Sequence, residues 1–99
     1  MADRIQITAN GTFTPIAKTF HMTGLMYNVS GTPTGLVLKV QDGDTPAHTI
    51  LNTAAIGAPT NAPVVVPLTG PGITMYNGIN IITSGASGSW VLDVWINQR

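Results

Sequence analysis

Short runs of alternating apolar and polar residues cover most of the chain. Ile, Val, Thr and aromatic residues dominate these runs, while 11 Gly and 7 Pro are spread over the whole length. Nowhere do apolar residues recur at i, i+3, i+4 and i+7 over ten or more positions, and the nearest helical candidate, residues 51–56, is too short and too close to Gly57 and Pro59. The pattern therefore predicts strands joined by turns.

Nine segments match this description, and Gly-containing turn signals such as Asn10-Gly11, Asp42-Gly43 and Asn77-Gly78 separate many of them. The predicted strands are Arg4–Ala9, Thr12–Ala17, Thr19–Asn28, Gly35–Gln41, His48–Asn52, Ala62–Leu68, Gly72–Met75, Gly78–Thr83 and Ser89–Asn97. Short strands at this spacing are typical of a sandwich or small barrel. We therefore predict an all-β fold, a single-domain antiparallel β-sandwich over residues 1–99, jelly-roll-like, with about eight strands. The segment of about residues 1–14 fits this sandwich least well. We expect it to be either a flexible arm or an arm that becomes ordered on a partner.

Alternation also predicts the two faces of each strand, because successive side chains point to opposite sides of a sheet. The predicted core rows are Trp90, Leu92, Val94 and Ile96; Leu36, Leu38 and Val40; and Phe20, Met22 and Met26. The opposite rows place four large apolar side chains outward, Leu25, Tyr27, Val37 and Trp95, and such patches usually mark a partner surface. These four are the candidate interface residues. The alternative is that one subunit covers both sheet faces itself, since buried sheets also lose clean alternation.

Charge is scarce, at 8% Asp, Glu, Lys and Arg, where soluble domains average roughly 25%. No run approaches the ~20 consecutive apolar residues that span a bilayer, and polar residues near the start interrupt any signal-peptide pattern, so no membrane partner is expected. Four basic residues balance four acidic ones, which removes the attraction that drives nucleic-acid binding. A neutral surface also does little to repel its own copies, so the composition favours a homo-oligomer. Cys is absent, which excludes disulfides and thiolate metal sites.

Catalytic chemistry is not expected. His21 and His48 are the ordinary candidates for a base near neutral pH, and neither lies in a recognisable catalytic motif. We interpret both as outward or hydrogen-bonded structural histidines, and we expect no enzyme activity, no catalytic residue and no cofactor.

Binding motifs are equally weak. Asp42-Gly43-Asp44 could begin a calcium loop, but the chain contains no Glu to close one, so we interpret the segment as a hairpin turn with no metal. Two Asn-x-Ser/Thr matches, at Asn10 and Asn28, are expected by chance in a chain this rich in those residues. Trp90 and Trp95 could stack on sugar rings, which keeps a carbohydrate-binding module open as the second hypothesis.

The order of features from about residue 22 to 97 resembles a known class of proteins. A strand ending in Tyr27-Asn28 is followed by an Asp-Gly turn, an apolar strand, two Gly-Ile strands and a long closing strand. The segments concerned are Leu25–Asn28, Leu36–Gly43, Ile50–Leu51, Val64–Leu68, Gly72–Ile73, Gly78–Ile82 and Ser89–Asn97. This rhythm is similar to the small β-sandwich decoration, or cement, proteins on the capsids of tailed bacteriophages.

The resemblance implies a structural virion protein, made in the host cytoplasm, that stabilises the capsid surface. It implies a homo-oligomer, most often a trimer, and a major capsid protein as the partner. A head-fibre or tail-fibre domain shares much of the pattern and remains an alternative. Met1 and the strand-like ending at Asn97 favour a complete small gene product over a piece of a fibre.

Overall fold

Residues 2–68 and 70–98, described by a computed structural model, form strands and connecting loops, with no helix among them. The strands are β1 (Ala2–Ile7), β2 (Gly11–Ile16), β3 (Phe20–Gly31), β4 (Val37–Asp42), β5 (Thr49–Asn52), β6 (Val64–Val66), β7 (Ile73–Met75), β8 (Ile79–Ser84) and β9 (Trp90–Gln98). Each corresponds to one of the nine predicted segments, with ends that differ by a few residues. The described part of the chain also contains no helical segment long and apolar enough to cross a membrane.

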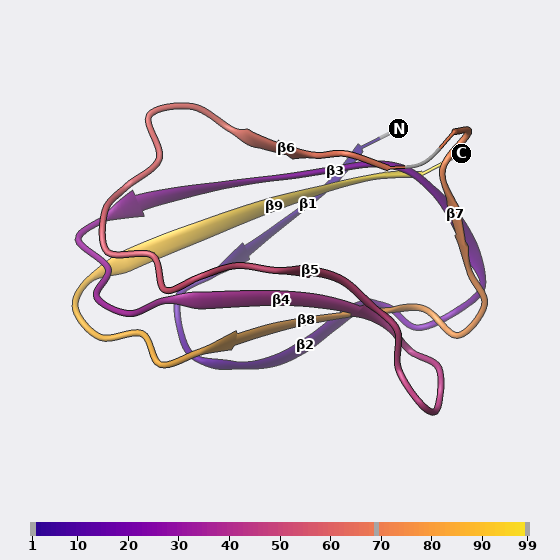
Figure 1. The fold of residues 1–99 in the computed structure, drawn as a ribbon, viewed down its shortest axis with the longest axis horizontal. Coiled ribbons are helices and arrows are strands. Elements are labelled where there is room, and N and C mark those ends of the chain that lie inside the picture. Colours follow the sequence, from indigo (N-terminus) through magenta and orange to yellow (C-terminus); the bar gives the residue numbers. More distant parts are fainter. Residues whose placement is uncertain (1, 69, 99) are drawn as a thin grey trace.

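The strands form two antiparallel sheets that pack face to face, one above the other in Figure 1. The first sheet has the order β1-β9-β3-β6, with β7 also paired to β3, and the second has the order β2-β8-β4-β5. Because β6 pairs with Leu25–Tyr27 and β7 with Phe20–Met22, they lie along one edge of β3 and together occupy one strand position. Nine strands in eight positions, in this order, give the predicted jelly-roll sandwich.

The core lies between the sheets and is built by alternation from both of them. Its residues are Ile7, Phe20, Met22, Leu25, Val29, Leu36, Leu38, Val40, Val66, Met75, Ile79, Ile81, Trp90, Leu92, Val94 and Ile96. The predicted inward rows of β9 and of Leu36, Leu38 and Val40 are confirmed.

The predicted faces of β3 are correct for its first residues and wrong after them. Met22 pairs with Gln98 and Gly24 with Asn97, so β3 carries one extra residue there, a β-bulge. A one-residue slip moves every later side chain to the other face of the sheet. Leu25 is therefore buried, at 3% exposure, and Met26, predicted to lie in the core, points outward opposite Trp95.

The N-terminal segment belongs to the sandwich. β1 pairs with β9 from Ala2 to Ile7, and β2 pairs with β8. The expectation of a separate arm over about residues 1–14 is corrected for the described residues, since both strands fill sheet positions; Met1 lies outside them.

Two of the predicted Gly turns are required for different reasons. Gly78 has a φ of +86°, and a Cβ there would lie 2.3 Å from the carbonyl oxygen of Ile16. Gly43 does not have a positive φ, but a Cβ at this position would lie 2.1 Å from the carbonyl oxygen of Asn77. The turn at Gly43 thus depends on close backbone approach rather than on the backbone angle that its sequence suggested.

Candidate functional site

An apolar row crosses the outer face of the first sheet. Directly opposed residues of antiparallel strands share a face, and here Val65 lies opposite Met26, Met26 opposite Trp95, and Trp95 opposite Arg4. Val65 is 70% exposed. The row places large apolar side chains on the outside of the molecule, three strands wide, with a cation at one end.

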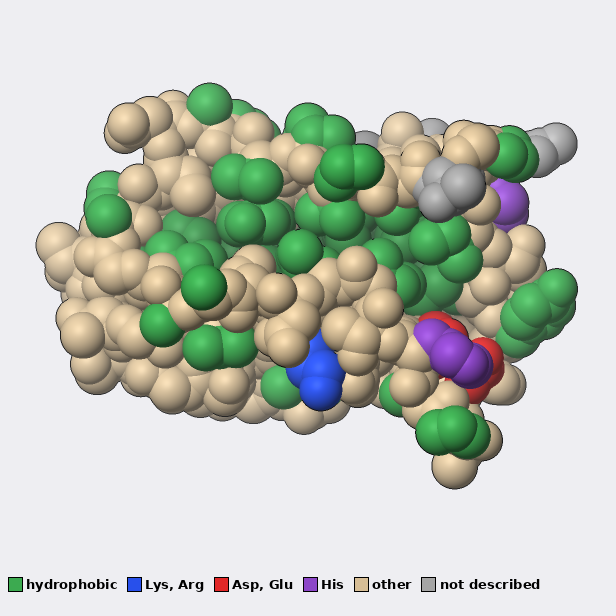
Figure 2. Space-filling model, viewed as in Figure 1, with side chains coloured by type: hydrophobic (Ala, Val, Ile, Leu, Met, Phe, Trp, Pro, Cys, Tyr) green, Lys and Arg blue, Asp and Glu red, His purple; other side chains and the backbone are tan. Residues whose placement is uncertain are grey.

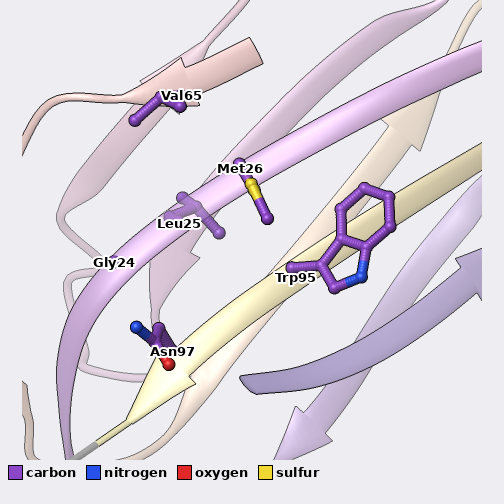
Figure 3. Close-up of a pocket in the computed structure, with 6 residues that line it drawn as sticks. All are labelled: Gly24, Leu25, Met26, Val65, Trp95 and Asn97. Carbon is purple, nitrogen blue, oxygen red and sulfur yellow. The ribbon is translucent and has the colours of Figure 1, made fainter. Parts of the chain in front are cut away.

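A hollow of about 160 Å³ lies within this row. Figure 3 shows the side chains of Met26 and Trp95 beside each other on β3 and β9, with Val65 on the neighbouring strand. The surface of this hollow is almost wholly apolar. We call it the sheet hollow, and the residues that line it are Gly24, Leu25, Met26, Val65, Trp95 and Asn97. Gly24 lies close to its partner on β9, since a Cβ at this position would lie 3.3 Å from Cβ of Asn97, tighter than an ordinary contact.

Arg4 and Asp93 form an ion pair next to the row, on β1 and β9. The Nη2 and Nε atoms of Arg4 donate to the same Asp93 oxygen at 2.9 and 3.1 Å, and the Gln6 amide nitrogen approaches it at 3.4 Å. Because the Arg4 side chain is 54% exposed, solvent screens the pair and its contribution to stability is small. One positive and one negative charge, paired with each other, thus lie beside the apolar row.

Only one of the four candidate interface residues lies at the sheet hollow with its side chain outward. Trp95 is half-buried on the outer face of the first sheet, as predicted. Leu25 is buried and forms the floor of the hollow from the core side. Tyr27 lies opposite Val94 on the inner face and packs against the core, so its predicted outward position is wrong for the same reason as that of Leu25, the bulge.

Val37 is half-buried and points outward, but on the second sheet, opposite Ser84. It cannot share a contact surface with Trp95, because the two outer faces are on opposite sides of the sandwich. The hollow instead contains Val65, Gly24 and Asn97, which the sequence did not single out, and Met26, which the sequence placed in the core. Gly24 inside a strand pattern is the one sequence signal of the bulge that brings them together.

His21 is held by its surroundings through both ring nitrogens. Nδ1 lies 3.0 Å from the Thr74 hydroxyl and Nε2 lies 2.8 Å from the Pro71 carbonyl oxygen. Such a ring fixes the start of β3 against β7 and the loop before it, and this arrangement agrees with the interpretation of His21 as a hydrogen-bonded structural histidine.

His48 lies at the end of the loop that joins β4 to β5, and Asp42 organises this loop. Oδ1 of Asp42 accepts hydrogen bonds from the backbone N–H groups of His48 at 2.8 Å and Asp44 at 3.2 Å, and Oδ2 lies 2.8 Å from Nδ1 of His48. Burial raises the pKa of the Asp42 carboxyl, but these hydrogen bonds and the imidazole together outweigh burial and leave the pKa below its ordinary value. The segment is a hairpin loop, as predicted, with Asp42 as its internal brace.

One carboxylate oxygen each from Asp42 and Asp44 and one His48 ring nitrogen lie within 4.8 Å of one another, a spacing that could hold a cation. Calcium takes six to eight oxygen ligands, and this group offers two carboxylates. Oδ2 of Asp42 is already engaged by the His48 ring, and Oδ1 of Asp44 accepts a hydrogen bond from the Asn77 amide at 2.6 Å. The arrangement is explained by the loop's own hydrogen bonds.

A second cavity opens where the edge of the second sheet faces the edge of the first, between β5 and the β6–β7 segment. Figure 2 shows hydrophobic side chains gathered along this opening, with His and Asp side chains at one end of it. The cavity, called the edge cleft below, has a volume of about 530 Å³. Its lining residues are Asp42, Asp44, His48, Thr49, Ile50, Pro67, Leu68, Ile73, Thr74 and Tyr76.

No protein-family model, curated protein or solved structure matches this chain.

Proposed function

We propose that this protein is a structural subunit that assembles with copies of itself through the outer face of its first sheet, as a decoration protein on the capsid of a tailed bacteriophage. The observation that carries the proposal is the sheet hollow with Trp95, Met26 and Val65 around it. An antiparallel sheet facing water normally presents polar side chains outward, so an apolar row of this kind needs a covering partner.

A second copy of the chain fits this surface in shape. Val65 projects beside the hollow, and both features lie on one face, so each copy offers a protruding side chain and a recess to receive one. A recess of about 160 Å³ accommodates an aliphatic side chain. Aromatic and Met side chains are the residues most enriched in the cores of such interfaces.

Charge favours the same occupant. The net charge is zero, and Arg4 and Asp93 next to the apolar row already neutralise each other, so two copies can approach without net repulsion. The resemblance to decoration proteins extends this to a trimer seated on a major capsid protein, with the virion surface as its location. A binding role of this kind needs neither a catalytic residue nor a cofactor.

The test is the solution mass of the protein and of Trp95→Ala, measured by light scattering at several concentrations. We expect an oligomer for the natural sequence and a shift toward monomer for the variant, with thermal unfolding nearly unchanged because Trp95 is outside the core. Val37→Ala on the other sheet is the control and should keep the oligomer. A natural protein that stays monomeric at all concentrations contradicts the proposal.

Binding to a capsid is tested separately. Cosedimentation with phage heads that lack their decoration protein should retain the natural protein and release Trp95→Ala. Equal retention of both would show that the sheet hollow takes no part in attachment.

A further inference from the structure

The edge cleft has the two-sided lining that a sugar ring requires. Ile50, Leu68 and Ile73 supply apolar surface, while Asp44, His48 and the hydroxyl of Thr49 supply polar groups. A pyranose ring is similarly two-sided, with C–H groups on its faces and hydroxyls around its rim. The volume of about 530 Å³ lies within the ~300–1,000 Å³ of small-molecule sites.

Tyr76 supplies the aromatic surface. It lines the cleft and yet is 67% exposed, the most exposed aromatic among the large hydrophobic residues of the described chain. It follows β7 directly, so its backbone is positioned by a sheet edge while its ring is free to contact a ligand. The C–H faces of sugars pack on aromatic rings in water, and Tyr combines such a face with a polar hydroxyl.

Two planar polar groups, the Asp44 carboxylate and the His48 ring, line the same cleft as Tyr76. The Asp44 carboxylate is oriented by the Asn77 amide at 2.6 Å, and its other oxygen lies 3.6 Å from Nδ1 of His48. The His48 side chain is 72% exposed. A carboxylate can accept two hydroxyl hydrogen bonds side by side, which matches neighbouring hydroxyls on a sugar ring.

Charge narrows the ligand class. Two carboxylates line the cleft and no Lys or Arg is among its lining residues, so phosphates, sulfates and sugar acids are repelled. The two carboxylates do not repel a neutral ligand, and they can accept hydrogen bonds from its hydroxyl groups.

From these observations we infer that the edge cleft binds a neutral saccharide, with Tyr76 packed on one face of the ring and the Asp44 carboxylate accepting hydrogen bonds from its hydroxyls. This activity is additional to the proposed assembly, since the edge cleft and the sheet hollow share no lining residue. A subunit with both surfaces would attach through one and hold a glycan with the other.

The experiment is saturation-transfer difference NMR with glucose, galactose, mannose and N-acetylglucosamine as probes, in EDTA, and with glucuronate as the anionic comparison. We expect transfer to the C–H protons of at least one neutral sugar and much less to glucuronate. Amide shifts should map to residues 42–49 and 73–77. Tyr76→Ala should weaken binding about tenfold or more, and Asp44→Asn should weaken it to a smaller degree.

Two controls separate this inference from the assembly proposal. Thr45→Ala lies in the same loop outside the cleft lining and should bind as the natural protein does. Trp95→Ala should lose assembly and keep sugar binding. The inference is overturned by transfer to none of the neutral sugars, by equal binding of glucuronate, by binding that requires added calcium, or by binding that survives both Tyr76→Ala and Asp44→Asn.

Discussion

The two outer faces of the sandwich differ although the two inner faces are built alike. On the second sheet the outward positions are mostly polar: Thr12 and Lys39 flank Ile82, Gln41 lies opposite Asn80, and Asn80 accepts a hydrogen bond from Thr14 at 2.7 Å. The first sheet also has polar outward positions, such as Gln6, Asn28 and Asp93, but one row across it holds Trp95, Met26 and Val65 around a hollow.

This difference shows which apolar positions folding explains and which it does not. Alternation explains the inner faces of both sheets, because both bury apolar side chains in one core. Folding places no such demand on an outer face, and the polar outer face of the second sheet shows that this chain can cover a sheet with Thr, Asn and Gln. The apolar row on the first sheet is therefore the feature that supports the proposed assembly.

The largest expected effect is on the free energy of unfolding, and it compares a substitution on the inner side of β9 with one on its outer side. Trp90 lies in the core at one end of β9 and Trp95 lies outward on the same strand. Trp90→Ala should lower the free energy of unfolding by ~3–5 kcal/mol, a large part of the ~5–15 kcal/mol of a small domain, while Trp95→Ala should change it far less. Thermal or denaturant unfolding of both variants measures this. If Trp95→Ala unfolds the protein and Trp90→Ala only alters its assembly, the assigned faces of β9 are inverted.

The next largest effect is on the self-association constant, and it is tested by one substitution on each outer face. Val65→Asp places a carboxylate at the proposed contact, where burial without a partner is costly, and should weaken self-association about 100-fold, or ~2.7 kcal/mol. Ile82→Asp, on the outer face of the second sheet beside Lys39, should leave association unchanged. Sedimentation equilibrium on both variants gives the two constants. Similar losses for both would remove the distinction between the faces.

The smallest expected effect is on the free energy of unfolding and comes from the β4–β5 loop, which lies on neither outer face. Asp42→Asn removes the carboxylate that three N–H groups contact and should cost about 1–2 kcal/mol of stability at pH 7, without changing self-association. The pKa of Asp42 is lowered in the folded state, so its stabilisation is complete above the unfolded pKa of ~3.9 and is lost as pH falls through the folded value.

The difference in unfolding free energy between the natural protein and Asp42→Asn should therefore shrink as the pH is lowered below about 4. Urea unfolding at pH 7, 5 and 3 measures it. A difference that grows toward acid would mean that the sign of the pKa shift is wrong.

Local pattern was enough to predict the strands, because period-two alternation and Gly turns are properties of neighbouring residues. It also predicted the inward row of β9 and the outward position of Trp95, since β9 runs from Trp90 to Gln98 without a slip in its burial pattern. The lack of charge, which removes electrostatic repulsion between copies, is likewise a property of composition alone.

Tertiary structure decided which outward residues meet. The bulge at Thr23, set by the register between β3 and β9, reversed the faces of Leu25, Met26 and Tyr27, and only strand pairing then joined Met26 to Trp95 and Val65. The edge cleft has the same origin, since Tyr76 and Asp44 are far apart in sequence and line one cleft because β7 and the β4–β5 loop lie at facing sheet edges. Alternation acts within one strand, whereas a binding surface depends on the register and packing of several.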